Sequence, residues 1–158
     1  MTTFLKVGDK APDFSLSATG DTTVRLYDAL KQGPVLLLFY PLDWSPVCTK
    51  ELCGINDGFR EFKNLGIQVL GISVDSVFSH GAFAEKHGIS FPLLSDFNRE
   101  VCTLYGVKHE EILGLKGIAK RSVFIIDTSG FLRFVWVSDD PSVMPDMDEI
   151  KRQIKALR

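Results

Sequence analysis

The sequence predicts an α/β sandwich around a mixed central sheet. Three short apolar runs are typical of strands covered on both faces, and they span Val35 to Tyr40, Val69 to Val74 and Val123 to Ile126. Segments with helical spacing separate these runs, and a hairpin follows the third. The alternation of strands and helices favours a parallel part of the sheet, and the hairpin adds an antiparallel part.

The elements follow in a simple order. An N-terminal hairpin is expected within residues 7–26, with its turn near Thr19 to Asp21. After the first central strand, a helix is predicted over 46–65, ending before Gly66. Its apolar side chains recur every three or four residues and define one buried face, formed by Cys48, Leu52, Ile55, Phe59 and Phe62.

Three shorter helices complete the expected fold, over residues 79–87, 98–105 and 148–158. Gly88 and Gly106 close the first two of them. The turn at 127–130, Asp-Thr-Ser-Gly, lies between two apolar strands and predicts an antiparallel pair.

Composition indicates one ordinary globular domain over residues 1–158. Hydrophobic residues make up 45% of the chain and charged residues 24%. With 18 basic and 20 acidic residues, the net charge is -2 and no basic block is present, so nucleic acid is not expected as a partner.

Targeting and redox signals indicate a cytoplasmic protein. The longest apolar run, VLLLFY, is far shorter than the roughly 20 residues that span a bilayer, so no membrane partner is expected. The first residues lack the pattern of a secretory signal. Three cysteines are an odd number, which argues against a closed structural disulfide framework and for reduced thiols.

Cys48 is placed for chemistry and for packing alike. Ser45 is a preferred N-cap residue and Pro46 fits the first helical position, which makes Cys48 the third residue of its helix. Free backbone N–H groups and the helix dipole stabilise a thiolate there. Burial on the apolar face favours the neutral thiol instead. From position alone, a nucleophile and a small core residue both remain open.

The stretch from Pro41 to Cys48, PLDWSPVC, resembles the P-x-x-x-[T/S]-x-x-C motif of the peroxiredoxins, the AhpC/TSA superfamily. Further matches, in the family's order, are VGDKAPDFSL, GISVDS, FPLLSD and the Arg121 that opens RSVFIID. The resemblance implies a thioredoxin-like fold and a thiol peroxidase that reduces hydrogen peroxide and organic hydroperoxides without a cofactor. It further implies that Cys48 is the peroxidatic cysteine, that Ser45 and Arg121 bind the peroxide oxygens, and that Pro41 shields the site. Without it, Arg121 would be interpreted as a surface arginine at a strand end.

The C-x4-C spacing of Cys48 and Cys53 resembles the bacterioferritin-comigratory or Q-type peroxiredoxins, which makes Cys53 the candidate resolving cysteine. On a helix, five residues separate two Cα atoms by roughly 8 to 9 Å, whereas a disulfide needs about 7 Å or less. A Cys48–Cys53 bridge therefore requires the helix to unwind, which the neighbouring Gly54 makes easier. Cys102 or an external thiol, as in one-cysteine members, remains an alternative. A thioredoxin-like dithiol is the expected reductant.

The histidines predict no metal site. His80, His87 and His109 show no ligand spacing with the cysteines and are expected at the surface. Neither a metal nor another cofactor is expected.

Two other functions share the same fold class. A disulfide oxidoreductase would carry C-x-x-C at a helix start, but the gap here is four residues. A non-catalytic binding or chaperone module would use the cysteines only for packing. Apolar residues expected at exposed edges, Trp44, Phe78 and Phe83, are compatible with a homodimer.

Overall fold

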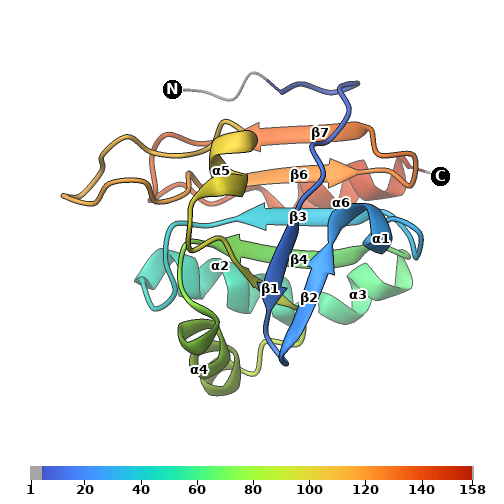
Figure 1. Cartoon of the computed structure of the whole chain (residues 1–158). Coiled ribbons are helices and arrows are strands. Elements are labelled where there is room, and N and C mark those ends of the chain that lie inside the picture. Colours follow the sequence, from blue (N-terminus) through green and yellow to red (C-terminus); the bar gives the residue numbers. More distant parts are fainter. Residues whose placement is uncertain (1–4, 158) are drawn as a thin grey trace.

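The computed structural model describes residues 5–157 and contains one seven-stranded sheet with helices on both faces (Figure 1). The strands are β1 Ser15–Ala18, β2 Thr22–Arg25, β3 Val35–Phe39, β4 Gln68–Ser73, β5 Leu93–Ser95, β6 Ser122–Ile126 and β7 Leu132–Val137. The helices are α1 Leu26–Ala29, α2 Pro46–Asp57, α3 Phe59–Asn64, α4 Val77–His87, α5 Glu100–Leu104 and α6 Met147–Lys155. The predicted α/β class with a mixed central sheet is confirmed.

The sheet is parallel at its centre and antiparallel at both sides. Its strand order is β2-β1-β5-β4-β3-β6-β7. Strand β4 runs parallel to both β3 and β5, and β6 runs antiparallel to β3 and β7. In the β3–β6 register, Phe39 lies opposite Ser122. The C-terminal end of β3 and the N-terminal end of β6 therefore lie side by side at one end of the strands.

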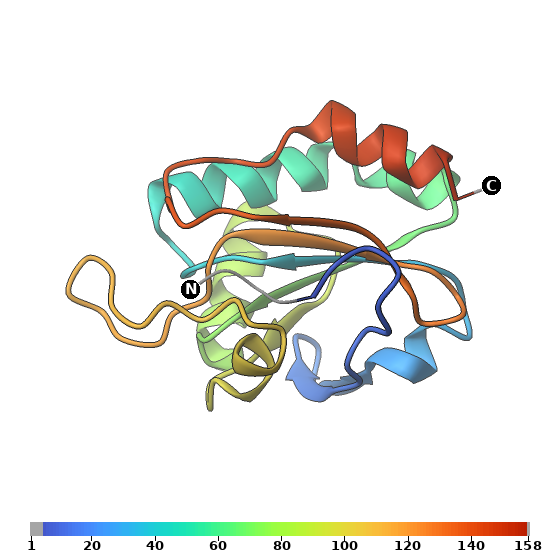
Figure 2. The same cartoon turned by 90° about the horizontal axis from the view of Figure 1, so that it is seen from above.

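The core is divided by the sheet into two halves (Figure 2). Because side chains alternate along a strand, Leu36 and Leu38 face one half while Leu37 and Phe39 face the other. The first half packs under α2, α3, α4 and α6. The second half packs under α1 and α5 and includes the β1–β2 hairpin. The segment 107–119 extends beyond one end of the sheet, as both views show (Figures 1 and 2).

Most predicted elements are present within one to three residues of their expected ends. The expected helix over 46–65 is wrong in one respect, since it is two helices separated at Gly58, whose φ of -93° and ψ of 9° lie outside the helical region. A glycine loses more conformational freedom in a helix than any other residue, which makes the break inexpensive. The helix predicted from residue 79 begins at Val77, because the Ser76 hydroxyl accepts a hydrogen bond from the Ser79 amide and caps it there.

Two short elements were not predicted, β5 and the single-turn helix α1. Both are too short to show a period in the sequence. The two predicted hairpins are confirmed. Asp21 and Gly130 have positive φ values, 56° and 89°, at the two turns.

Candidate active site

The topology brings Cys48 and Arg121 together from positions far apart in the sequence. Arg121 directly precedes β6, and Pro41 follows β3 at the same end of these two strands. The loop 41–45 then leads into α2, where Cys48 is the third residue. Arg121 Nη2 donates to Cys48 Sγ over 3.2 Å. Both side chains are buried, Cys48 at 0% and Arg121 at 1% exposure.

The guanidinium of Arg121 is held on three sides. Its Nη1 donates to Glu51 Oε1 at 2.7 Å. Its Nε and Nη2 donate to the Pro141 carbonyl at 3.2 and 2.8 Å. The surface position that sequence reasoning alone would assign to Arg121 is therefore wrong, since buried partners fix the fork of its donors.

Glu51 is a site residue whose burial and pairing with Arg121 the sequence did not predict. Its side chain is buried, whereas an unpaired glutamate is ordinarily solvated. Burial raises the pKa of its carboxyl to about 7, against the opposing charge and hydrogen bond of Arg121. One signal was available in the sequence: Glu51 lies three residues after Cys48, so the two share a helix face.

Ser45 and Pro41 frame the loop before Cys48. Ser45 occupies the N-cap position, but its side chain makes no capping bond; its hydroxyl donates to the Leu42 carbonyl at 3.3 Å. Pro41 is buried at the sheet edge. Trp44 has a positive φ of 73°, and its Nε1 donates to Ser79 Oγ at 3.3 Å. The loop is thus bound to α4 through a residue in a strained backbone conformation.

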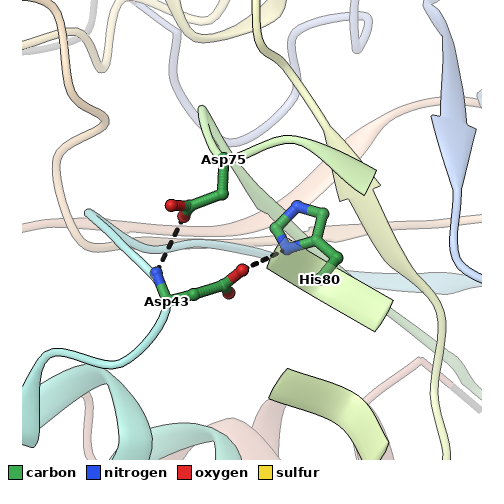
Figure 3. A group of neighbouring side chains, drawn as sticks. All are labelled: Asp43, Asp75 and His80. Carbon is green, nitrogen blue, oxygen red and sulfur yellow. Dashed lines mark hydrogen bonds and ion pairs between the residues drawn. The ribbon is translucent and has the colours of Figure 1, made fainter. Parts of the chain in front are cut away.

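A buried polar network anchors the same loop. Asp43 accepts hydrogen bonds from the Tyr40 hydroxyl at 2.6 Å and from Ser79 Oγ at 2.8 Å. His80 Nδ1 lies 2.8 Å from Asp43 Oδ2 (Figure 3). The surface position expected for His80 is wrong, since it is fully buried, and His109 is also buried at 5% exposure.

Asp43, Asp75 and His80 bring their ligand atoms within 4.8 Å of one another, a spacing that can hold a cation. These atoms already have protein partners, however. The Asp43 amide and Ser73 Oγ donate to Asp75 Oδ2 at 2.7 and 2.6 Å, and His80 Nε2 lies 3.0 Å from the Leu94 carbonyl. The arrangement is that of a hydrogen-bonded tether between the loop and α4.

The other two cysteines differ in their access to Cys48. Cys53 is half-buried on α2, and burial together with Asp57 raises its pKa. Cys102 is fully buried in α5, in the other half of the core from Cys48. Burial, reinforced by Asp96, raises the pKa of its thiol to about 12. All three thiols are free. Cys53 is therefore the better placed partner for Cys48.

Trp44 and Phe83, two of the apolar residues expected at exposed edges, pack against each other. Their rings are 5.2 Å apart and perpendicular. Phe83 is fully buried, so its expected exposure is wrong, whereas Trp44 and Phe78 are 47% and 86% exposed.

A buried cysteine at a helix N-terminus, hydrogen-bonded by an arginine beside a mixed sheet, defines a thiol-dependent enzyme of the thioredoxin-fold class.

Similarity to known proteins identifies the family within that class. The AhpC/TSA family model matches residues 7–135. A chloroplastic 2-cysteine peroxiredoxin of Chattonella marina var. antiqua is 40% identical over 98% of this chain and 81% of the relative. The putative peroxiredoxin bcp of Coxiella burnetii is 43% identical over 84% of this chain and 88% of the relative.

Two solved structures share the fold over nearly their full length. Peroxidoxin BcpB from Mycobacterium tuberculosis superposes with a TM-score of 0.86 at 36% identity, covering 98% of this chain and 99% of the other. A cysteine-to-serine mutant of PrxQ from Xylella fastidiosa gives a TM-score of 0.87 at 28% identity, with 98% of each chain covered.

The chain belongs to the AhpC/TSA family, the peroxiredoxins. The expected thioredoxin-like fold and the expected thiol-dependent peroxidase are thereby confirmed. The disulfide oxidoreductase and the non-catalytic module are not supported. Among residues 5–157, no helix is long and apolar enough to cross a membrane.

Proposed function

We propose that Cys48 is the peroxidatic cysteine, and that Arg121 and Ser45 bind the peroxide while Pro41 shields it from water. The observation that carries this assignment is the 3.2 Å hydrogen bond from Arg121 Nη2 to Cys48 Sγ at the start of α2. A guanidinium donor and the amides of the first helical turn both stabilise negative charge on sulfur.

The reaction follows from this geometry. The Cys48 thiolate attacks one peroxide oxygen, so that an S–O bond forms as the O–O bond breaks. Two electrons pass from sulfur to the peroxide, and the second oxygen leaves as hydroxide or alkoxide. The negative charge therefore moves from sulfur to the leaving oxygen. Arg121 stays protonated and can follow this charge, and the Ser45 hydroxyl can both donate and accept a hydrogen bond.

Cys53 then resolves the Cys48 sulfenic acid as an intramolecular disulfide, and a thioredoxin-like dithiol reduces it. Support comes from the half-buried position of Cys53 on the same helix and from the burial of Cys102 in the other half of the core. Since five helical residues hold Cα atoms roughly 8 to 9 Å apart, α2 must unwind locally before the sulfurs meet.

Mass spectrometry tests this cycle directly. The wild type, Cys53→Ser and Cys102→Ser variants receive one equivalent of peroxide, and the free thiols are then blocked. The expected results are a Cys48–Cys53 disulfide in the wild type and in Cys102→Ser, and a trapped Cys48 sulfenic acid in Cys53→Ser. A sulfenic acid in all three proteins would assign resolution to an external thiol. An unoxidised Cys48 would refute its peroxidatic role.

Three further features belong to the same proposal. The chain acts as one domain in the cytoplasm, where a reducing environment keeps its three free thiols reduced.

The chain forms a homodimer through the face that carries Phe78 and Phe97, which are 86% and 58% exposed and line one shallow hollow. Analytical ultracentrifugation of wild type and Phe78→Ser tests the dimer, which the serine is expected to weaken. A monomeric wild type would refute it.

A further inference from the structure

Arg121 contacts two different acids at once. Its Nη2 donates to the Cys48 thiol sulfur at 3.2 Å, and its Nη1 donates to Glu51 Oε1 at 2.7 Å. The only other acceptor that the guanidinium contacts in the described part of the chain is the neutral Pro141 carbonyl. One buried cation therefore serves two groups, each of which is an anion when deprotonated.

Burial makes it costly for both groups to be charged together. Cys48, Glu51 and Arg121 all have exposures of 4% or less. A thiolate and a carboxylate beside one guanidinium would leave a net negative charge out of water, which is expensive unless it is fully hydrogen-bonded. The Glu51 carboxyl is not fully hydrogen-bonded, because its Oε2 is buried and accepts no hydrogen bond from residues 5–157. The neutral carboxyl is the form that this environment accommodates.

We infer that Cys48 and Glu51 share a single proton, and that Glu51 supplies this proton to the leaving oxygen when the Cys48 thiolate reduces a peroxide. The inference rests on the proposed peroxidatic role of Cys48. Glu51 is a proton-holding residue that is linked to the reacting sulfur through the Arg121 guanidinium, which it also positions.

The step balances without any additional reactant. The thiolate of Cys48, the carboxylic acid of Glu51 and hydrogen peroxide give the sulfenic acid, the carboxylate and water. Sulfur loses two electrons, the peroxide O–O bond accepts them, and the carboxyl proton neutralises the hydroxide. Arg121 has one anionic partner before the reaction, the sulfur, and one afterwards, Glu51. The net charge of the buried site does not change.

The pKa of Glu51 fits this role. Burial raises it to about 7, so a large fraction of the carboxyl groups retain the proton near neutral pH and can release it during turnover. The titratable groups that face Glu51 are Arg121, which contacts it directly, and Cys48, which shares the guanidinium.

Proton counting during one turnover tests the inference. In a Cys53→Ser, Cys102→Ser background the reaction stops at the sulfenic acid, and a pH-indicator dye in weakly buffered solution reports proton uptake. Once the sulfur is oxidised, Glu51 is the only anionic partner of Arg121, and the guanidinium stabilises the carboxylate against reprotonation from solvent. Just below pH 7 we therefore expect no net uptake per Cys48 oxidised, rising towards one well above pH 7, where Glu51 has already lost its proton before the reaction. Glu51→Gln in the same background is expected to take up one proton at both pH values, because no buried acid remains to supply it.

The controls separate the possible failures. Glu85→Gln removes an exposed carboxyl on α4 and should behave as the background protein does. Mass spectrometry of the same samples reports whether Cys48 is oxidised. If Cys48 is not oxidised, the peroxidatic role is refuted rather than the shared proton. Equal uptake in the background protein and Glu51→Gln, whether zero or one, would overturn the inference. If Glu51→Gln does not fold, uptake of one proton by the background protein below pH 7 would overturn it alone.

Discussion

Replacing Gly54 with alanine should slow disulfide formation without slowing the reaction with peroxide. Gly54 lies inside α2, directly after Cys53, and a Cβ added there would meet no atom within 4 Å. Alanine is therefore tolerated in the helix and favours it by about 0.8 to 1.0 kcal/mol over glycine. Because the helix must unwind before Cys53 reaches Cys48, this energy adds to the barrier. The bridge should form roughly four- to fivefold more slowly.

Rapid quenching with a thiol-blocking reagent, followed by mass spectrometry, gives the two rates separately. The loss of the Cys48 thiol reports the peroxide step, and the appearance of the Cys48–Cys53 disulfide reports resolution. Gly81→Ala is a matched control, since Gly81 is exposed in α4 and its added Cβ also meets open space. Both variants should be more stable to denaturant by about 1 kcal/mol, but only Gly54→Ala should resolve slowly. An unchanged resolution rate in a stabilised Gly54→Ala protein would refute the unwinding step.

Three other perturbations follow from the site. Arg121→Lys keeps the charge but loses the fork that spans Cys48 and Glu51, so the second-order rate with peroxide should fall roughly 100-fold or more in stopped-flow assays, and a fall below tenfold would contradict the assignment. Asp43→Asn disrupts the buried pair with His80 and should lower the free energy of unfolding in urea by about 3 kcal/mol; a loss under 1 kcal/mol would argue against the tether. The pKa of Glu51 is higher in the folded protein than in the unfolded chain, so ionisation of Glu51 should lower the free energy of unfolding by up to about 3 kcal/mol as pH rises from 4.5 to about 7. The Glu51→Gln variant should lack this decline. If the free energies of unfolding of the two proteins instead changed in parallel with pH, the raised pKa would be disproved.

The fold was predictable because its central strands and longer helices carry strong periodic signals. The apolar runs gave β3, β4 and β6 within one residue, and the buried face of α2 followed from its spacing. The break at Gly58 was not predicted, because the apolar spacing continues through it to Phe62. Short elements such as β5 depend on tertiary pairing and leave no periodic signal.

The site was only partly predictable, for a different reason. Cys48 and Ser45 lie together in one motif, whereas only the family resemblance placed Arg121 at the site, because its contact depends on the β3–β6 register, which no local pattern specifies. The burial of Glu51 and His80 was missed because charged and polar residues are ordinarily solvated. Each is buried against a partner distant in sequence, Arg121 for the glutamate and Asp43 for the histidine.

The packing of Trp44 makes the protein its own spectroscopic reporter. The indole stacks edge-on against Phe83 and lies one residue before Ser45, whereas the other tryptophan, Trp136, lies in β7. If the start of α2 unwinds to form the bridge, the Trp44 ring should lose its aromatic contact while the surroundings of Trp136 stay the same. The emission of a Trp136→Phe variant, which retains only Trp44, would then follow the opening and closing of the helix in real time, without an attached dye.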